Sequence, residues 1–186
     1  MKKKTIAMDM DGVLANVTPA LLGQISLDVG KPVTVANVTA WDWLTPLGLP
    51  EDYFTKTYCN LWEAYPLAAF EPCERRVAEY MMELCENCQV DIVTGHNESS
   101  RQAVAAWLEH YQIPYHRLIM HGCFVSKSGL AYDIFVDDSP SFAKKIAVDP
   151  RGRKLFLFDW PYNRDVPPSN AVTRIRSLHN ILPHIE

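Results

Sequence analysis

Short apolar runs alternate with amphipathic stretches along most of the chain. The apolar runs predict buried strands at residues 5–8, 89–94, 118–120, 134–136 and 154–158. Apolar positions spaced three and four residues apart predict helices at residues 19–29, 74–86, 98–111 and 139–148. Strands that alternate with helices are typical of an α/β fold whose parallel sheet is covered by helices on both faces. Residues 31–70 differ from this pattern, because they are aromatic, punctuated by prolines and irregular.

Composition fits one globular domain with room for a small inserted subdomain, since 48% of the 186 residues are hydrophobic and 22% are charged. A net charge of -4 argues against a surface that binds nucleic acid polymers. The basic start, Lys2 to Lys4, lacks a signal-peptide core because Asp9 interrupts the apolar run that follows it. No stretch is long and uncharged enough to cross a bilayer. We therefore expect a cytoplasmic protein that binds neither membranes nor nucleic acid polymers.

Five cysteines are an odd number without the spacing of a disulfide framework, so we expect reduced thiols. Cys85 and Cys88 have the spacing of a metal or redox site. No second cysteine or histidine pair stands at a matching distance, so ordinary thiols are the better interpretation.

Two acids, Asp9 and Asp11, stand where the first strand should end and a loop should begin. There one carboxylate can act as a nucleophile while the other serves as acid and base, and Gly12 lets the backbone approach a ligand. A calcium loop can start in the same way. That template needs further oxygen ligands at fixed offsets, which Leu14 and Ala15 do not supply.

Polar side chains also follow other predicted strands. Because parallel strands end at one edge of a sheet, where ligands bind, these side chains should converge there with the first acids. Crowded carboxylates require a cation, and hard oxygen ligands favour Mg²⁺. Magnesium, a hydroxyl and an ammonium together suit a phosphoryl group. The convergent residues are Asp9, Asp11, Thr94, Gly95, His96, Lys127, Asp137 and Asp138.

Each of these residues has an ordinary structural explanation when it is taken alone. Thr94 could cap a strand, Lys127 could be a solvated surface residue, and Asp138 could cap the helix that follows it. Their joint occurrence at successive strand ends favours a catalytic site.

The order of these residues resembles the four motifs of the haloacid dehalogenase superfamily of phosphotransferases: Asp9 to Val13, Thr94, Lys127, and Asp137 with Asp138. Within that superfamily, the chain looks like the 5'(3')-deoxyribonucleotidase family and its bacterial relatives. The narrower likeness rests on residues 9–15, on the spacing from Lys127 through Asp133 to Asp137, and on residues 157–164.

The resemblance implies a Rossmann-like catalytic core at residues 1–16 and 73–186 and a helical cap at residues 17–72. It implies that Asp9 attacks phosphorus, that Asp11 is the acid and base, and that Thr94 and Lys127 bind the phosphoryl oxygens. It also implies a magnesium site formed by Asp9, Asp137 and the backbone carbonyl of Asp11, with Asp138 acting through water.

The chain departs from the nucleotidases at Gly95 and His96, where a serine and a proline are more usual. The departure leaves the leaving group open, and His96 could bind phosphate or sugar or simply shape the turn. The role of the cap tryptophans also has two interpretations. Trp43 and Trp62 could stack on a base as part of the substrate site, or they could form the small core that a cap needs.

The sequence therefore predicts a magnesium-dependent phosphomonoesterase that acts on nucleoside monophosphates, most of all deoxyribonucleoside monophosphates. One alternative keeps the chemistry and replaces the substrate with another small phosphomonoester, such as a sugar phosphate. Another is a binding module on a phosphatase scaffold, which the complete set of motif residues disfavours. The partner is a small molecule, and a homodimer is compatible with these features.

Overall fold

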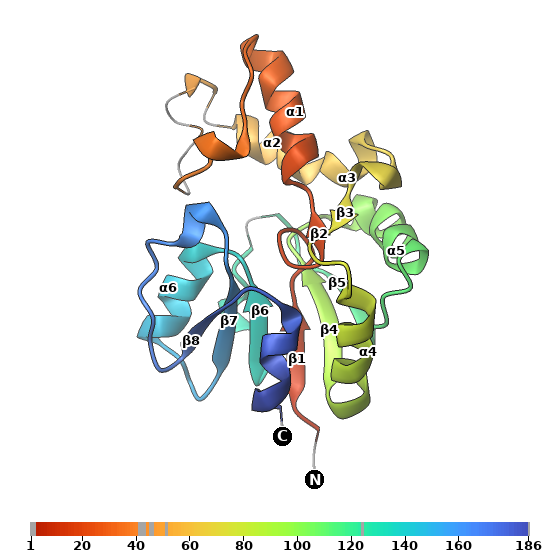
Figure 1. Cartoon of the computed structure of the whole chain (residues 1–186), viewed down its shortest axis with the longest axis vertical. Helices are drawn as coiled ribbons and strands as arrows, with labels where there is room; N and C mark the ends of the chain where they lie inside the picture. The colour runs from red at the N-terminus through yellow and green to blue at the C-terminus, as the bar shows by residue number, and fades with distance from the viewer. Residues whose placement is uncertain (1–2, 41–43, 45–46, 51, 124, 186) are drawn as a thin grey trace.

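A six-stranded parallel sheet forms the centre of the computed structural model, which describes residues 3–40, 44, 47–50, 52–123 and 125–185 (Figure 1). The first strand lies in the middle, so its carboxyl end opens at the centre of the sheet edge. In spatial order the strands are β5 (Arg117–Met120), β4 (Gln89–Thr94), β1 (Thr5–Met8), β6 (Ile134–Asp137), β7 (Lys154–Phe158) and β8 (Val172–Ile175).

Helices cover both faces of the sheet, as the sequence pattern predicts. Ile6 and Met8 of β1 pack in the cluster that includes α4 (Val77–Asn87), α5 (Arg101–His110) and η7 (Leu178–His184). Ala7, between them, faces the opposite cluster, which contains α6 (Pro140–Val148). This division follows from the alternation of side chains along a strand. The predicted α/β fold with a parallel sheet is confirmed.

Two details of the sheet layer differ from the sequence pattern. Strand β8 was not predicted, because Val172–Ile175 is a short edge strand with exposed Thr173 between its apolar residues. Helix α4 begins at Val77, three residues later than the amphipathic pattern suggests. The carboxylate of Glu74 instead accepts hydrogen bonds from Ser177 and Leu178 near the C-terminus.

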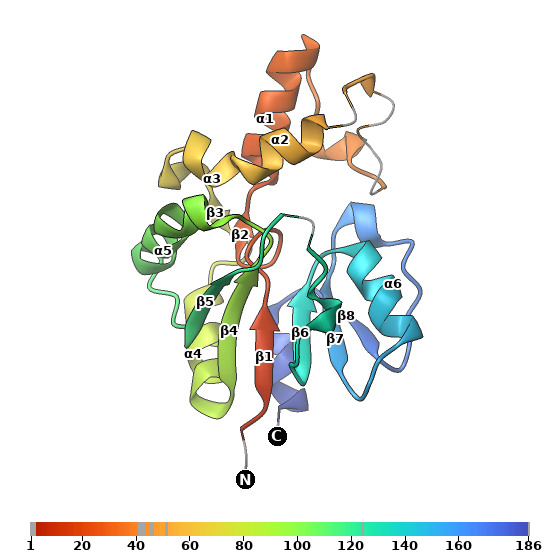
Figure 2. The ribbon, with the colours of Figure 1, turned by 180° about the vertical axis from the view of Figure 1, so that it is seen from behind.

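An insert between β1 and β4 lies over the carboxyl ends of the strands (Figures 1 and 2). The chain enters it at β2 (Ala15–Asn16) and returns at β3 (Glu71–Pro72), and these two strands pair antiparallel. Its helices are α1 (Thr18–Val29), α2 (Tyr53–Cys59) and α3 (Leu61–Ala64), with short 3₁₀ turns η1 (Val35–Asn37) and η3 (Leu67–Ala69). The sheet layer also contains the 3₁₀ turns η4 (Glu98–Ser100), η5 (Lys127–Gly129) and η6 (Pro161–Asn163).

The insert has a small apolar core of its own. Leu21, Leu22 and Ile25 on one side of α1 pack against Val33 and Val38. This cluster also includes Tyr162, which belongs to the sheet layer. The contact joins the cap to the edge of the sheet where the polar residues gather.

Cys59 of α2 and Cys123, in the loop after β5, form a disulfide across 64 residues of sequence. The expectation that all the thiols are reduced is therefore wrong for this pair, which only the fold brings together. Cys73, Cys85 and Cys88 are free. None of the helices in the described ranges has both the length and the apolar character that a membrane span requires.

Candidate active site

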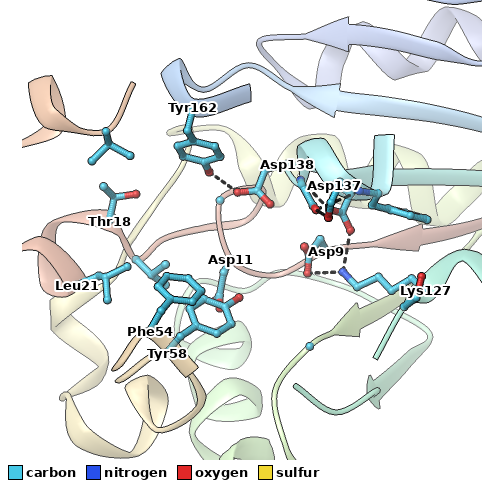
Figure 3. Close-up of a pocket in the computed structure, with 18 of the residues that line it drawn as sticks. Asp9, Asp11, Thr18, Leu21, Phe54, Tyr58, Lys127, Asp137, Asp138 and Tyr162 are labelled. Carbon is cyan, nitrogen blue, oxygen red and sulfur yellow. Dashed lines mark hydrogen bonds and ion pairs between the residues drawn. The ribbon is translucent and has the colours of Figure 1, made fainter. Parts of the chain in front are cut away.

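A cavity of about 490 Å³ lies between the cap and the carboxyl ends of the strands (Figure 3). Its floor carries charged side chains from the sheet layer, and its roof is mostly apolar. The charged residues from the sheet layer are Asp9, Asp11, Lys127, Asp137, Asp138 and Lys145, and the cap contributes Val17, Thr18, Leu21, Val38, Leu44, Phe54 and Tyr58.

Lys127 joins the first and fourth sequence motifs. Its Nζ lies 2.8 Å from Oδ1 of Asp9 and 2.8 Å from Oδ2 of Asp137. Burial favours the neutral amine, but the two carboxylates outweigh it and raise the pKa of Lys127 above its ordinary value. Burial also raises the pKa of Asp9 well above its usual range, and the nearby Lys127 opposes that shift. The ammonium is thus held as a cation beside the candidate nucleophile.

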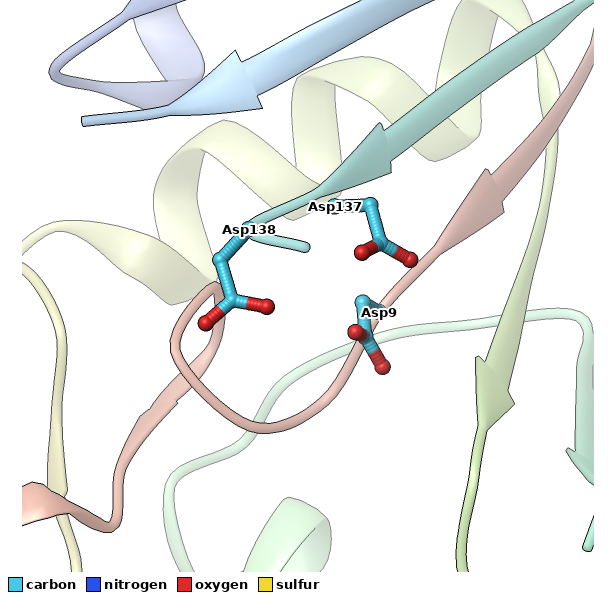
Figure 4. A group of neighbouring side chains, drawn as sticks. All are labelled: Asp9, Asp137 and Asp138. Atoms are coloured by element: carbon cyan, nitrogen blue, oxygen red, sulfur yellow. The ribbon is translucent and has the colours of Figure 1, made fainter. Parts of the chain in front are cut away.

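Asp9, Asp137 and Asp138 form a compact group of carboxylates, with one oxygen of each within 4.8 Å of the others (Figure 4). Burial and the adjacent Asp137 raise the pKa of Asp138 to about 7. Like charges so close together favour either protonation or a bound cation. Three hard oxygen donors fit Mg²⁺ better than a softer transition metal.

Asp11 points to the other side of the cavity floor and is held by hydrogen-bond donors. Nε1 of Trp62 donates to its Oδ1 over 2.9 Å, and Nε2 of His96 lies 2.5 Å from its Oδ2. The hydroxyl of Tyr58 also hydrogen bonds to this carboxylate. Burial would raise the pKa of Asp11, but His96, followed by Tyr58 and Trp62, holds it below the ordinary value. Asp9 and Asp11 therefore occupy different electrostatic environments although one residue separates them.

Three residues that the sequence predicts in the substrate site do not line the cavity. Thr94 ends β4 with no exposed surface, and its Oγ1 accepts a hydrogen bond of 3.4 Å from the amide of His96. His96 is also fully buried and is directed at Asp11. Trp62 is 1% exposed and packs against Phe70 in the core, and it is not among the residues that line the cavity.

The other two nominated substrate-binding residues have different outcomes. Gly95 lines the cavity directly, between buried Thr94 and His96. Trp43 lies outside the described residues.

Residues 160–163, to which the sequence analysis gave no role, hold residues of the site in place through hydrogen bonds. The hydroxyl of Tyr162 donates to Asp138, as Figure 3 shows, and Nδ2 of Asn163 donates to the carbonyl of Asp138 over 2.9 Å. Nε1 of Trp160 donates to the carbonyl of Gly12 over 2.6 Å. The signal was present in the resemblance at residues 157–164, but these contacts become visible only in the fold.

Comparison with known proteins identifies the family. The sequence profile of the family described as "5' nucleotidase, deoxy (Pyrimidine), cytosolic type C protein" matches residues 3–182. The chain belongs to this family. Its members fall within the haloacid dehalogenase-like hydrolases, and the chain is accordingly a hydrolase of phosphoric monoesters, as the sequence predicts. A search of curated proteins found no match.

Solved structures with the same fold share little sequence with the chain. A haloacid dehalogenase-like hydrolase from Streptococcus pneumoniae superposes with a TM-score of 0.65 at 13% identity, covering 99% of each chain. A Lactobacillus plantarum protein assigned as a phosphoglycolate phosphatase gives 0.62 at 16% identity, covering 98% of this chain and 99% of that one. A Bacillus subtilis hydrolase of the superfamily, bound to magnesium, gives 0.55 at 13% identity with full coverage of both. At these identities the likeness establishes the fold alone.

Proposed function

We propose that the protein is a magnesium-dependent phosphatase of nucleoside monophosphates, with deoxyribonucleoside monophosphates as its main substrates. The observation that carries the proposal is the arrangement of Asp9 on the cavity floor, paired with Lys127 and flanked by Asp137 and Asp138. The family match supports a nucleotide as the substrate. The proposal extends to a cytoplasmic location, in keeping with the family's description, and leaves room for a homodimer.

The chain's own residues account for both halves of the reaction. A carboxylate oxygen of Asp9 attacks phosphorus, forming an aspartyl-phosphate as the bond to the leaving oxygen breaks. Asp11 enters this step in its protonated form and gives its proton to the leaving oxygen. Asp11 then takes a proton from the water that attacks the same phosphorus, which releases Asp9 and inorganic phosphate. Lys127, beside Asp9, stabilises the negative charge of the phosphoryl oxygens.

Magnesium would be held by Asp9 and Asp137, with Asp138 beside them. The resemblance to the superfamily adds the backbone carbonyl of Asp11 as a further ligand. Bound there, it would offset the charge of the carboxylates and of the transferring phosphoryl group. The B. subtilis structure bound to magnesium supports this choice of ion for a protein of the same fold.

The roof of the cavity suits an apolar or aromatic leaving group. The rings of Phe54 and Tyr58 stack at a centroid distance of 5.3 Å and an interplanar angle of 13°, and both residues line the cavity with Leu21 and Val38. A nucleobase offers a flat, largely apolar face to such a surface. A sugar phosphate would offer this roof a more polar surface than a nucleobase does.

A panel of phosphomonoesters tests the proposal. Deoxyribonucleoside, ribonucleoside and sugar monophosphates are compared by kcat/KM in the presence of Mg²⁺, with Asp9→Asn as the inactive control. We expect nucleotides to exceed sugar phosphates, with no activity and no trapped phosphoenzyme in Asp9→Asn. A preference for sugar phosphates would replace the nucleotide assignment. Absence of hydrolysis throughout would overturn the assignment of Asp9.

A further inference from the structure

The carboxylate of Asp11 receives hydrogen bonds from both sides of the domain boundary. Trp62, on α3 of the cap, binds Oδ1, and His96, in the loop after β4, lies against Oδ2. Tyr58 of the cap is the third donor. A carboxylate offers about four lone-pair positions, so one remains for a substrate or water. Asp11 is thus restrained without being saturated.

Among the described residues, the side chain of His96 makes one hydrogen bond, although the residue is buried. The residue is fully buried, and its Nδ1 has no hydrogen-bond partner among the residues that the structure describes. Burying an imidazole nitrogen without a partner costs free energy. In the part of the chain that the structure describes, the ring makes one hydrogen bond, from Nε2 to Asp11 over 2.5 Å, so the contact with Asp11 is what this position provides.

Aromatic rings fix the plane of the imidazole. Tyr58 stacks on His96 at a centroid distance of 4.9 Å and an interplanar angle of 22°. Trp62 meets it edge-on at 6.3 Å and 79°. These are the same two cap residues that hydrogen bond to Asp11. The ring therefore cannot turn toward the cavity without disturbing the cap, and its Nε2 stays directed at Asp11.

We propose that His96 is a positioning residue, which holds the carboxylate of Asp11 in the orientation that delivers a proton to the leaving oxygen. The proposal rests on the function above, in which Asp11 is the acid and base. Proton transfer needs heavy atoms within about 2.6–3.2 Å, so a carboxylate free to rotate spends little time in the productive geometry. His96 is not among the residues that line the cavity where the phosphoryl group would bind. Its removal should slow proton transfer and leave substrate binding unchanged.

Two amide variants separate positioning from general structural damage. In His96→Gln, the side-chain N–H reaches about as far as Nε2 and can still donate to Asp11. In His96→Asn, the amide is too short to reach it, although its size and polarity are similar. Both variants are checked for native melting behaviour, and both are measured on an alkyl phosphomonoester from the panel and on p-nitrophenyl phosphate. The p-nitrophenolate leaving group of the aryl ester needs no proton. The rate of phosphoryl transfer from this ester therefore measures whether the other catalytic residues still function.

We expect His96→Asn to lower kcat for the alkyl ester by roughly 10²-fold, within the range of general acid catalysis, with KM nearly unchanged. Single-turnover phosphoenzyme formation from the aryl ester should stay close to wild type, and His96→Gln should recover most of the alkyl rate. Equal losses on both esters, a change in KM alone, or identical kinetics in the two variants would overturn the proposal.

The nucleotide assignment fails separately, because it is judged on the wild-type protein. If wild type prefers another alkyl ester, that ester replaces the nucleotide in the comparison, and the contrast between alkyl and aryl esters still tests His96.

Discussion

The α-carbon of Gly12 faces the carboxylate of Asp138 with no room for a side chain between them. A Cβ built on Gly12 would overlap Oδ2 of Asp138 and would lie 3.2 Å from the hydroxyl of Tyr162. Gly12 also has a φ of +73°, a conformation that glycine adopts without strain. The loop of the first motif and the acids of the fourth thus depend on each other's placement.

Replacing Gly12 with alanine should therefore displace Asp138. We expect a loss of stability of about 1–3 kcal/mol from overpacking, and a loss of magnesium affinity of about 10–100-fold from the displaced carboxylate. Metal titration and denaturant unfolding measure the two effects. Gly23→Ala is the matched control, since nothing lies within 4 Å of a Cβ at that position in α1. It should leave metal affinity unchanged, and similar losses in both variants would contradict the explanation.

Tyr162→Phe should weaken magnesium binding and leave the shape of the cavity unchanged. The change removes the hydroxyl that donates to Asp138 and keeps the ring that lines the cavity. Outer hydrogen bonds to metal-binding carboxylates are typically worth about 10–100-fold in affinity or activity, and we expect a loss in that range. Tyr132→Phe removes a comparable hydroxyl from buried Asp91, away from the cavity, and should affect stability alone. Unchanged magnesium affinity in Tyr162→Phe would show that Asp138 does not need this donor.

Much of the sheet layer can be predicted from the sequence, because strand alternation and strand-end acids are local signals. Asp9 and Asp137 follow apolar runs, and parallel topology then brings them to one edge. The partners of Asp11 could not be predicted. Trp62 and His96 are 34 residues apart in number, on different sides of the cap boundary, and no local pattern links either of them to Asp11. The same holds for Tyr162, whose contact with Asp138 depends on how the late segment returns to the sheet edge.

Lys127→Met should abolish most turnover while retaining the fold. The variant keeps the length of the side chain but leaves Asp9 and Asp137 without their shared cation, 2.8 Å from each in the wild type. We expect kcat to fall by about 10²–10³-fold, as when one preorganised donor to a developing charge is removed. Lys144→Met is the control, because Lys144 pairs with Asp165 on the surface and does not line the cavity. Comparable kcat values for the two variants would argue against a role for Lys127 in transfer.

The cluster of Asp9, Asp137 and Asp138 predicts an unusual dependence of stability on pH in the metal-free protein. Asp9 and Asp138 have raised pKa values, that of Asp138 to about 7, so the folded state binds protons that the unfolded state has already released. Stability then falls as pH rises toward and through about 7, since it falls wherever the folded state binds more protons. Asp91 and Asp159 have lowered pKa values, and their stabilising effect is complete above the ordinary aspartate range, near pH 4.

Thermal melting in EDTA should therefore give a lower Tm at about pH 8 than at about pH 5.5. Added Mg²⁺ should raise Tm at both values and more strongly at the higher one, because the metal binds the ionised carboxylates and competes with protons for them. Asp138→Asn removes one of the two raised groups, so its Tm in EDTA should fall less over the same range. Mutation of Asp149, a surface acid paired with Arg151, should leave the wild-type slope unchanged. Two results would show that these carboxylates are already ionised in the folded protein. One is a metal-free Tm that rises steadily with pH over this range, and the other is a rise in Tm on adding Mg²⁺ that becomes smaller at higher pH.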